Sequence, residues 1–477
     1  MTKRQVINQF LFEEGQDAYK YGIGASSHLL VDKHEGIAKY GKKPVTTSIR
    51  QMPQLVSWTL PYPTNLLYLF KRDDTVYALA ENPNYNGEMS IIEFDSDGGY
   101  AVKASIEDTQ RFHLIAFNFC SCQCGDYEFI LMRVLDGTVL LAYNVSDNTL
   151  VEITLPKNGT IKATSICYWA GHLFINDETS DKVWYSSIVL TASDITQIFS
   201  DSAYRQMGYK DGNSLWVGVL NGSLWSISSS YIQKWTDSDS TLVPIYADTS
   251  AITEMHTFKA LPYVGGVLLS SSDMHGIKHL YQFEGKELVA IETEELGNKL
   301  NQNQYPNAAM LASFETHPLL IVQFADGTYV YDTSNGLWVM DNYWSTAIQV
   351  IQDVGLETNS QSRVSKVQIA NPGKVWYRIG SIWLDGNVDF YCDRIALKVR
   401  ATKTAASTDL IVKYRMRSLE TETEPDWIYE SFTLPFGNSE IQCMNCGYGN
   451  ILDLQVIGTG AIELYDVRAE ITGGGRW

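Results

Sequence analysis

Short aromatic or apolar segments recur along the chain at a nearly constant spacing. Their starts lie 64, 43, 49, 47, 50 and 46 residues apart. A repeat of roughly 40–50 residues in an all-β pattern is typical of a β-propeller with four strands in each blade. The markers are Val-Tyr-Ala-Leu from Val76, Leu-Leu-Ala-Tyr from Leu140, Val-Trp-Tyr-Ser from Val183, Ile-Gln-Lys-Trp from Ile232, His-Leu-Tyr-Gln from His279, Tyr-Val-Tyr-Asp from Tyr329 and Val-Trp-Tyr-Arg from Val375. They predict an all-β fold with a six- or seven-bladed propeller over residues 53–380.

Turn dipeptides separate the predicted strands. Asp-Gly occurs at residues 97–98, 136–137, 211–212 and 326–327, and Asn-Gly at 86–87, 158–159, 221–222 and 335–336. These dipeptides supply the positive φ angles that two-residue hairpin turns require. We therefore expect hairpins of residues 215–220 with 223–227 and of 319–324 with 329–332. Helical periodicity is nearly absent, and only residues 191–204 suggest a short helical turn.

The two ends of the chain differ from this middle part. Residues 1–52 have mixed charge and weak periodicity, which predicts an N-terminal arm or irregular lead-in. Residues 381–477 contain longer alternating strands with one polar face, which is typical of a β-sandwich, here jelly-roll-like. The expected boundary lies near residues 379–394.

Two strands of the predicted sandwich place basic residues opposite their apolar ones. The basic positions are Lys398, Arg400, Lys413, Arg415 and Arg417. A stripe of this kind could contact an acidic partner surface or nucleic acid; the alternative is a solvated sandwich face. Acidic residues follow at once, and they would neutralise the stripe across a hairpin: Glu420, Glu422, Glu424 and Asp426.

Composition limits the partners. The 477 residues carry a formal charge of −19, and residues 1–50 contribute +3 of it, which leaves −22 for the rest. An acidic body disfavours DNA wrapping, because phosphate binding needs clustered Lys and Arg. It suits a surface that must not hold DNA, and equally an ordinary soluble acidic protein. The start lacks a signal-peptide pattern and no stretch approaches the ~18–20 apolar residues of a membrane span, so we expect synthesis in the cytoplasm and no membrane span.

Motifs of enzyme, cofactor or metal chemistry are weak or missing. The sequence has no nucleotide-binding loop, zinc-protease motif or nucleophile elbow, so we expect no catalytic residue, cofactor or metal. His275 and His279 have metal-ligand spacing only on a helix, and a turn is predicted there. Cys120, Cys122 and Cys124 share one strand face, while Cys443 and Cys446 form a lone C-x-x-C. Reduced structural thiols are expected, and a metal shared by these clusters stays open.

The middle and end of the chain resemble a known family. The residues that carry the resemblance are Gly171-His-Leu-Phe-Ile-Asn-Asp, Val183-Trp-Tyr-Ser-Ser, Asp201-Ser-Ala-Tyr, Gly212-Asn-Ser-Leu-Trp-Val, Ser230-Tyr-Ile-Gln-Lys-Trp, the hairpin at 319–339 and the terminal Glu463-Leu-Tyr-Asp-Val-Arg-Ala-Glu-Ile. Their layout over residues 160–477 is similar to the tail hub or nozzle proteins of short-tailed phages (podoviruses), also called packaged-DNA stabilisation or head-completion proteins.

The resemblance implies a structural virion protein of the tail tube. Such a protein forms a homo-hexamer below the portal and adaptor proteins and next to tail fibre or needle proteins. It closes the head–tail channel, retains packaged DNA and conducts it through the lumen during ejection, without sequence-specific binding. The alternative is a carbohydrate-binding or glycoside-cleaving propeller of a receptor-recognising tail component. A glycosidase needs two carboxylates that flank the sugar, and the repeated turn motif of sialidase propellers is missing.

Overall fold

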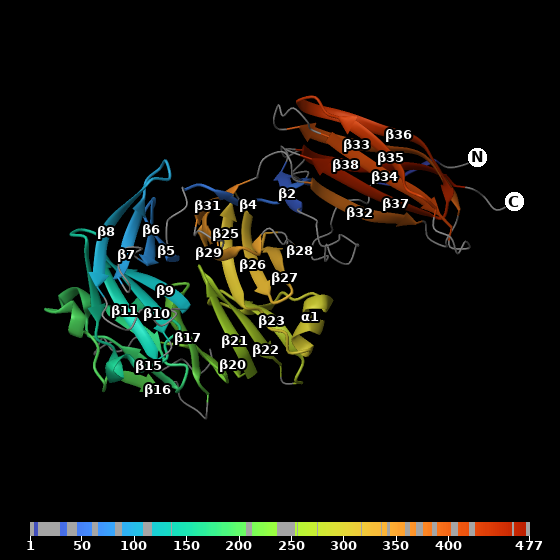
Figure 1. The fold of residues 1–477 in the computed structure, drawn as a ribbon. Coiled ribbons are helices and arrows are strands. Elements are labelled where there is room, and N and C mark those ends of the chain that lie inside the picture. Colours follow the sequence, from blue (N-terminus) through green and yellow to red (C-terminus); the bar gives the residue numbers. More distant parts are fainter. Residues whose placement is uncertain are drawn as a thin grey trace.

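The structure is a computed structural model of the chain. It describes residues 4–7, 29–35, 45–59, 65–81, 88–107, 117–134, 136–206, 212–235, 253–254, 256–273, 275–315, 317–334, 336–340, 344–357, 363–368, 375–383, 389–401, 409–418, 425–459 and 462–473. Strands dominate these residues, as Figure 1 shows. The predicted all-β fold is confirmed.

The middle of the chain folds into four-stranded antiparallel units, which we number 1 to 7 along the chain (Figure 1). Units 1 to 3 are β5 (Leu66–Arg72), β6 (Thr75–Glu81), β7 (Glu88–Phe94) and β8 (Tyr100–Glu107); β9 (Phe117–Cys124), β10 (Tyr127–Val134), β11 (Gly137–Asn144) and β12 (Thr149–Ile153); and β13 (Ile166–Trp169), β14 (His172–Asn176), β15 (Lys182–Tyr185) and β16 (Tyr204–Gln206). Units 4 and 5 are β17 (Ser214–Leu220), β18 (Ser223–Ser228), β19 (Tyr231–Lys234) and β20 (Thr253–Glu254); and β21 (His256–Tyr263), β22 (Gly266–Ser272), β23 (Lys278–Phe283) and β24 (Leu288–Ala290). Units 6 and 7 are β25 (Ala308–Phe314), β26 (His317–Phe324), β27 (Gly327–Asp332) and β28 (Leu337–Met340); and β29 (Ala347–Gln352), β30 (Val354–Glu357), β31 (Arg363–Gln368) and β4 (Gln54–Ser57).

These units close into a ring. The first strand of each unit contacts the first strand of the next, and β29 of unit 7 contacts β5 of unit 1. Units 6 and 7 are joined further by a short parallel pairing of β25 with β29. The outermost strand of unit 7 is β4, which comes from the N-terminal side of unit 1 and pairs with β31. The ring is therefore closed by strands from both ends of the propeller segment.

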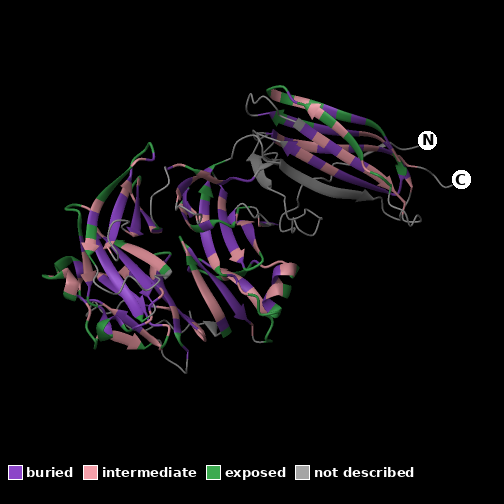
Figure 2. Ribbon diagram, viewed as in Figure 1, coloured by how far each residue is buried: buried purple, intermediate pink, exposed green. Residues whose placement is uncertain are grey.

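Apolar layers between the units hold the ring together. On β10, Phe129 and Leu131 belong to the core between units 2 and 3, whereas Ile130 and Met132 belong to the core between units 1 and 2. Both faces of such a strand are covered, so its sequence is a continuous apolar run instead of an alternation. Figure 2 shows these inner strands as largely buried.

The predicted hairpins are confirmed. β17 pairs with β18 and β26 with β27. In the first of these, Asn221 and Gly222 both have positive φ, at 50° and 74°. That is the geometry for which the Asn-Gly dipeptide was expected.

The strand markers do not all fall at the same place in a unit. Five of them lie in third strands, but the one from Val76 lies in the second strand, β6, which explains the long first gap. The marker from Val375 was wrong as a blade strand, because β32 (Val375–Trp383) pairs with β37 (Ile451–Thr459) outside the ring. Apolar-aromatic runs mark strands, and such a strand can belong to either domain.

The C-terminal part forms two sheets. One contains β1 (Arg4–Ile7), β2 (Leu29–Glu35), β3 (Val45–Gln51), β33 (Phe390–Ala401), β36 (Gly437–Gly449) and β38 (Ile462–Gly473); the other contains β32, β34 (Asp409–Arg417), β35 (Ile428–Thr433) and β37. Side chains of both sheets share one buried cluster, which continues into units 6 and 7. We call this two-sheet part the sandwich.

The N-terminal segment was wrongly predicted as an irregular lead-in. Its strand β1 pairs with β38, and β3 also joins β38 after a hairpin with β2. The boundary near 379–394 was also wrong, because β32 begins at Val375 and belongs to the sandwich. In both cases the partner strand lies far away in the sequence, so local periodicity could not reveal the pairing.

Helical structure is sparse in the described residues. α1 (Glu294–Asn301) begins after Thr293, whose side chain accepts a hydrogen bond from the backbone N–H of Leu296. Its buried Leu296 and Leu300 pack on units 5 and 6. The sequence did not predict this helix. Short 3-10 turns occur at Pro156–Gly159, Val189–Thr191 and Ile195–Gln197, and the last lies where a helical turn was expected.

Charge is divided unequally between the two parts. Residues 52–374 carry 18 Lys and Arg against 36 Asp and Glu, a net charge of −18. The segments that flank them contain 18 basic and 19 acidic residues, a net charge of −1. The propeller segment thus carries nearly all the negative charge, whereas the segments that supply the sandwich are close to neutral.

Gln349 on β29 links the last unit of the ring to the first. Its Oε1 accepts a hydrogen bond from the backbone N–H of Leu69 at 2.6 Å, and its Nε2 donates one to the Leu69 carbonyl at 2.8 Å. Leu69 is fully buried on β5. One side-chain amide therefore replaces a strand partner for both backbone groups of this residue.

We expect Gln349→Ala to destabilise the protein by roughly 2–4 kcal/mol, because two buried backbone groups lose their partner. The free energy of unfolding in urea measures this loss. Gln304→Ala, at an exposed side chain, is the control and should change stability little. Equal losses in the two variants would contradict a role of Gln349 in ring closure.

Glu128 is a carboxyl group buried between units 1 and 2. It is 1% exposed, it accepts a hydrogen bond from Ser121, and its Oε2 has no hydrogen-bond partner among the described residues. Burial raises the pKa of Glu128 to about 7, against the opposing effects of Ser121, Arg72 and Gln123. The folded protein therefore binds the Glu128 proton more tightly than the unfolded chain does.

Because the folded-state pKa of Glu128 is raised, its contribution to stability is greatest below the unfolded pKa of about 4.3 and falls as pH rises towards 7. Glu128→Gln removes this titration, and we expect it to stabilise the protein at pH 8 relative to wild type by about 2–3 kcal/mol. Urea unfolding at pH 5 and pH 8 tests this, with exposed Glu107→Gln as control. If the unfolding free energy of the wild-type protein did not decrease between pH 5 and pH 8 relative to that of Glu128→Gln, the raised pKa of Glu128 would be contradicted.

Candidate interaction surface

The five predicted basic residues do not form one stripe. Lys398 and Arg400 lie on β33, whereas Lys413, Arg415 and Arg417 lie on β34, and the two strands belong to different sheets. The apolar neighbours of both strands, such as Leu397 and Val412, point into the shared core. The basic side chains therefore point to opposite outer faces of the sandwich. The prediction assumed that strands adjacent in sequence pair with each other, and here they do not.

The basic residues of β34 are bound within their own sheet. The Nε atoms of Arg415 and Arg417 lie 2.9 Å and 2.6 Å from Oδ2 of Asp453 on β37, and this carboxylate is 4% exposed. The Arg415 guanidinium also lies 4.6 Å from the ring centroid of Trp427. This half of the predicted stripe is consequently part of the fold of its sheet. Of the acidic run, Glu420, Glu422 and Glu424 lie outside the described residues, and Asp426 is exposed.

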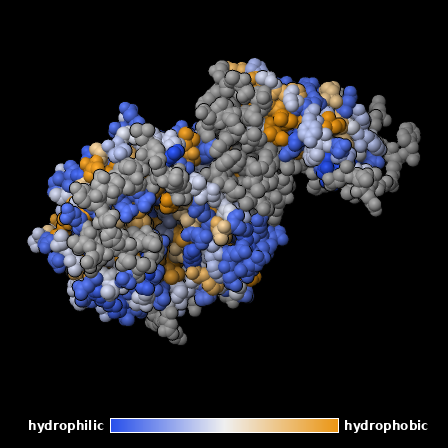
Figure 3. Space-filling model, viewed as in Figure 1, coloured by the Kyte–Doolittle hydropathy of each residue, from blue (hydrophilic) through white to orange (hydrophobic). Residues whose placement is uncertain are grey.

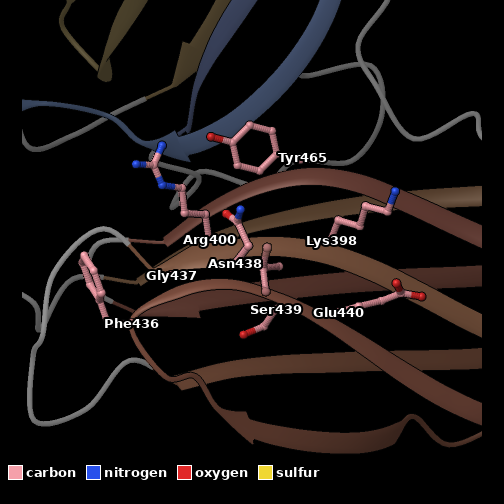
Figure 4. A pocket seen from close by; sticks show the side chains of 9 residues that line it. Lys398, Arg400, Phe436, Gly437, Asn438, Ser439, Glu440 and Tyr465 are labelled. Atoms are coloured by element: carbon pink, nitrogen blue, oxygen red, sulfur yellow. The ribbon is translucent and has the colours of Figure 1, made fainter.

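A groove lies on the outer face of the other sheet, where Lys398 and Arg400 are found. Its volume is about 780 Å³, and its lining residues are Lys398, Val399, Arg400, Phe436, Gly437, Asn438, Ser439, Glu440 and Tyr465. Figure 4 shows Arg400 and Tyr465 rising from neighbouring strands, with Phe436 at one end and Lys398 and Glu440 at the other. Two cations, a carboxylate and two aromatic rings thus share one open surface.

Charges in this groove are only loosely held. Nη1 of Arg400 lies 3.8 Å from Oε2 of Glu463, and the Arg400 side chain is 52% exposed. Tyr465 donates a hydrogen bond to the same carboxylate at 2.5 Å. Exposed ion pairs at such distances add little stability. The groove could therefore exchange these contacts for those of a partner.

Exposed apolar side chains occur on both sheets of the sandwich. Phe436 is 67% exposed in the turn between β35 and β36, and Met444 on β36 is 55% exposed. The others in this part are Tyr391, Ile428, Tyr429 and Tyr448. We call these six residues the apolar edge; Figure 3 shows hydrophobic atoms on the visible face of the sandwich. The sequence analysis missed them, although apolar residues at the outward positions of an alternating strand were a usable signal.

Two strand edges accompany these residues. Within the described part of the chain, β35 pairs only with β34 and β36 only with β33. An open edge presents unpaired backbone groups, and proteins usually cover or charge such edges. Edge strands that carry exposed aromatic and aliphatic side chains indicate a surface for another protein.

The cysteines are free thiols. Cys120, Cys122 and Cys124 lie on β9 as predicted, and Cys443 and Cys446 lie on β36. Burial raises the pKa of Cys120 to about 12 and that of Cys122 well above its ordinary value. Among the described residues, no group of three or more His, Cys, Asp or Glu side chains is arranged to hold a metal ion.

His279 is held between two carboxylates. Its Nδ1 lies 2.5 Å from Oε1 of Glu292, and its Nε2 lies 3.6 Å from Oδ2 of Asp273. Burial lowers the pKa of His279, but its interactions with Glu292 and Asp273 outweigh burial and raise it. Asp273 caps the turn that contains His275 by accepting backbone hydrogen bonds from His275 and Ile277. His275 is thus part of a turn, and His279 is part of strand β23.

We expect Asp453→Asn to destabilise the protein by about 2–3 kcal/mol, because it removes the charge that two partly buried arginines share. The free energy of unfolding in urea measures the effect. Asp426→Asn, at an exposed carboxylate, is the control and should lie within about 0.5 kcal/mol of wild type. If Asp453→Asn behaved like the control, Arg415 and Arg417 would not be structural residues.

Comparisons with known proteins add little to this geometry. No family model matches the sequence, and no curated protein matches it. Among solved structures, the chain is similar to a puromycin-hydrolyzing peptidase of Mycobacterium tuberculosis (11% identity over 70% of this chain and 60% of that one, TM-score 0.37). It is also similar to the β-propeller domain of the Trilobed protease from Pyrococcus furiosus (11%, 64% and 94%, 0.35) and to a putative 6-phosphogluconolactonase from Bacteroides fragilis (11%, 71% and 98%, 0.39).

The limits of these similarities are clear from their scores. The matched region is 60% of the length of the peptidase, and all three TM-scores are at or below 0.39. Such scores carry no argument about activity, so the propeller-like fold rests on the sheet topology described above. In the part of the chain that the structure describes, no helix is long and apolar enough to cross a membrane.

Proposed function

We propose that this protein is a structural virion protein of a phage tail tube, a nozzle or hub subunit that assembles through its sandwich. In this role it closes the head–tail channel, retains packaged DNA and conducts it during ejection, without catalysis of its own. The observation that carries the proposal is the position of the apolar edge: its six exposed side chains lie on β35, on β36, in the turn between them and on the adjacent β33, and β35 and β36 each have one open edge among the described strands. A surface of this kind favours contact with other proteins.

The charge distribution supports different roles for the two parts, the propeller next to DNA and the sandwich in assembly. The propeller segment carries a net charge of −18 and the segments of the sandwich −1. Like charges repel DNA phosphates, so an acidic propeller beside a channel would let DNA slide without binding. A nearly neutral domain with exposed apolar residues can associate at low electrostatic cost. The resemblance of residues 160–477 to short-tailed phage tail proteins agrees with this proposal.

Assembly is the property to test first. The mass of the purified protein in light scattering, with negative-stain images of the protein alone and with portal–adaptor complexes, should reveal a six-fold ring with a central hole. The ring can form alone or only upon docking. A monomer that binds none of the head–tail components would contradict the proposal. A glycan array would then test the alternative, a carbohydrate-binding or glycoside-cleaving propeller.

Substitution of the apolar edge should weaken assembly specifically. We expect Phe436→Ser with Met444→Ser to raise the dissociation constant of the assembly by about tenfold or more, because exposed aromatic and Met side chains dominate interface energies. Val264→Ser, at a 50% exposed residue of the propeller, is the matched control. Sedimentation velocity measures both, and circular dichroism confirms folding. Equal assembly of the two variants would place the interface elsewhere.

A further inference from the structure

Three of the seven cysteines converge in the core of the sandwich. Cys392 on β33 and Cys443 on β36 are 0% exposed, and Cys446 on β36 is 1% exposed. All three belong to the same buried cluster of side chains. The sequence analysis recognised Cys443 and Cys446 as a C-x-x-C pair but did not connect them with Cys392, which lies about fifty positions earlier.

An irregularity in strand pairing places Cys446 beside Cys392. Cys392 pairs with Gly447 and Arg394 pairs with Met444, so two residues of β36 lie opposite one residue of β33. Asn445 and Gly447 accommodate the extra length with positive φ angles of 56° and 120°. A bulge of this kind re-aims side chains, and here it turns the Cys446 side chain into the core.

The strand pairing brings the buried side chains of Cys392 and Cys446 next to each other. The Cys392 thiol donates a hydrogen bond to the Arg394 carbonyl at 3.9 Å, and the Cys446 thiol donates one to the Cys443 carbonyl at 3.5 Å. The neighbouring Cys392 lowers the pKa of Cys446 against the opposing effect of burial, and Cys446 together with burial raises the pKa of Cys392. In the propeller, burial instead raises the pKa of Cys120 to about 12.

We propose that Cys392 and Cys446 are a thiol pair that is converted to a disulfide cross-link between β33 and β36 by a peroxide oxidant. The Cys446 thiol gives up its proton and its sulfur attacks one oxygen of the peroxide; the O–O bond breaks, Cys446 becomes a sulfenic acid, and the other oxygen takes up a proton and leaves as water or alcohol. The Cys392 thiol then attacks the sulfenic sulfur, the S–S bond forms, and the sulfenic oxygen leaves as water with the Cys392 proton. Each cross-link thus oxidises two thiols and reduces one peroxide. This inference does not depend on the proposed tail-tube function.

Access to the buried pair requires local opening, and β36 is suited to it. It pairs only with β33 among the described strands, and the bulge interrupts that pairing next to Cys446. Edge segments with interrupted ladders open more readily than central strands. We therefore expect slow oxidation in the native protein and faster oxidation in low concentrations of urea that do not unfold it.

The experiment uses the full chain, reduced, freed of reductant and treated with hydrogen peroxide. The expected product has lost two hydrogen atoms, and non-reducing peptide mapping links Cys392 to Cys446. Because the bond closes a long loop, the cross-linked protein should unfold at a Tm several degrees higher, and a reductant should restore the original Tm. Cys443→Ser should form the same link, whereas Cys446→Ser and Cys392→Ser should not.

Several outcomes would overturn the proposal. A link between Cys443 and Cys446, a sulfinic acid on Cys446 without a link, or unmodified thiols after full oxidation of a small-molecule thiol control would each do so. If a serine variant fails to fold, the mapping of the unsubstituted protein decides, because it identifies the linked residues directly. Cys120→Ser, at a thiol of the propeller, should leave the rate and the product unchanged.

Discussion

Closure of the ring is the constraint on which the propeller depends, and it relies on two distant segments of the chain. Three strands of unit 7 (β29, β30 and β31) come from the C-terminal end of the propeller segment, and the fourth, β4, comes from its N-terminal end. The contact between Thr59 and Val364 next to this pairing spans 305 positions. Every apolar layer between units is formed by two neighbouring units, so an open ring would expose one of these layers on the facing sides of its two end units. Gln349 adds the polar part of the closure by satisfying Leu69 across the last interface.

Similar side-chain bonds to the backbone occur between other units. Gln123 of unit 2 donates to the Lys71 carbonyl of unit 1 at 2.7 Å, and Thr164, which precedes unit 3, donates to the Leu215 carbonyl of unit 4 at 3.0 Å. Apart from the short pairing of β25 with β29, the first strands have no strand partner on the inner side among the described strands, and side-chain amides and hydroxyls partly replace it. Apolar layers supply most of the stabilisation, and these bonds satisfy backbone groups that would otherwise be buried without partners.

The sequence predicted the local features well and the long-range ones poorly. Periodic aromatic segments and the Asn221–Gly222 turn identified the strands and hairpins, because both depend on neighbouring residues. The markers could not distinguish β32 of the sandwich from a blade strand, since an apolar-aromatic run is compatible with a strand of either domain. Pairing of β1 and β3 with β38 was not visible, and for the same reason Lys398 and Lys413 were assigned to one face. The apolar edge was missed because the strand β36, which carries Met444, was not predicted, and exposure of apolar side chains depends on which face of a sheet they occupy.

The propeller is inserted between the segments that build the sandwich, and this has a consequence for synthesis. β1 and the hairpin of β2 and β3 emerge from the ribosome before the propeller, whereas β38, the partner of β1 and β3, emerges after it. The whole ring can close once β31 has emerged, before β38 has been synthesised. Until β38 has emerged, β1 and β3 lack this partner strand, and their edges are open to other chains. A truncated product would therefore retain a propeller but lack a completed second domain, and it would be a natural target for chaperones and proteases.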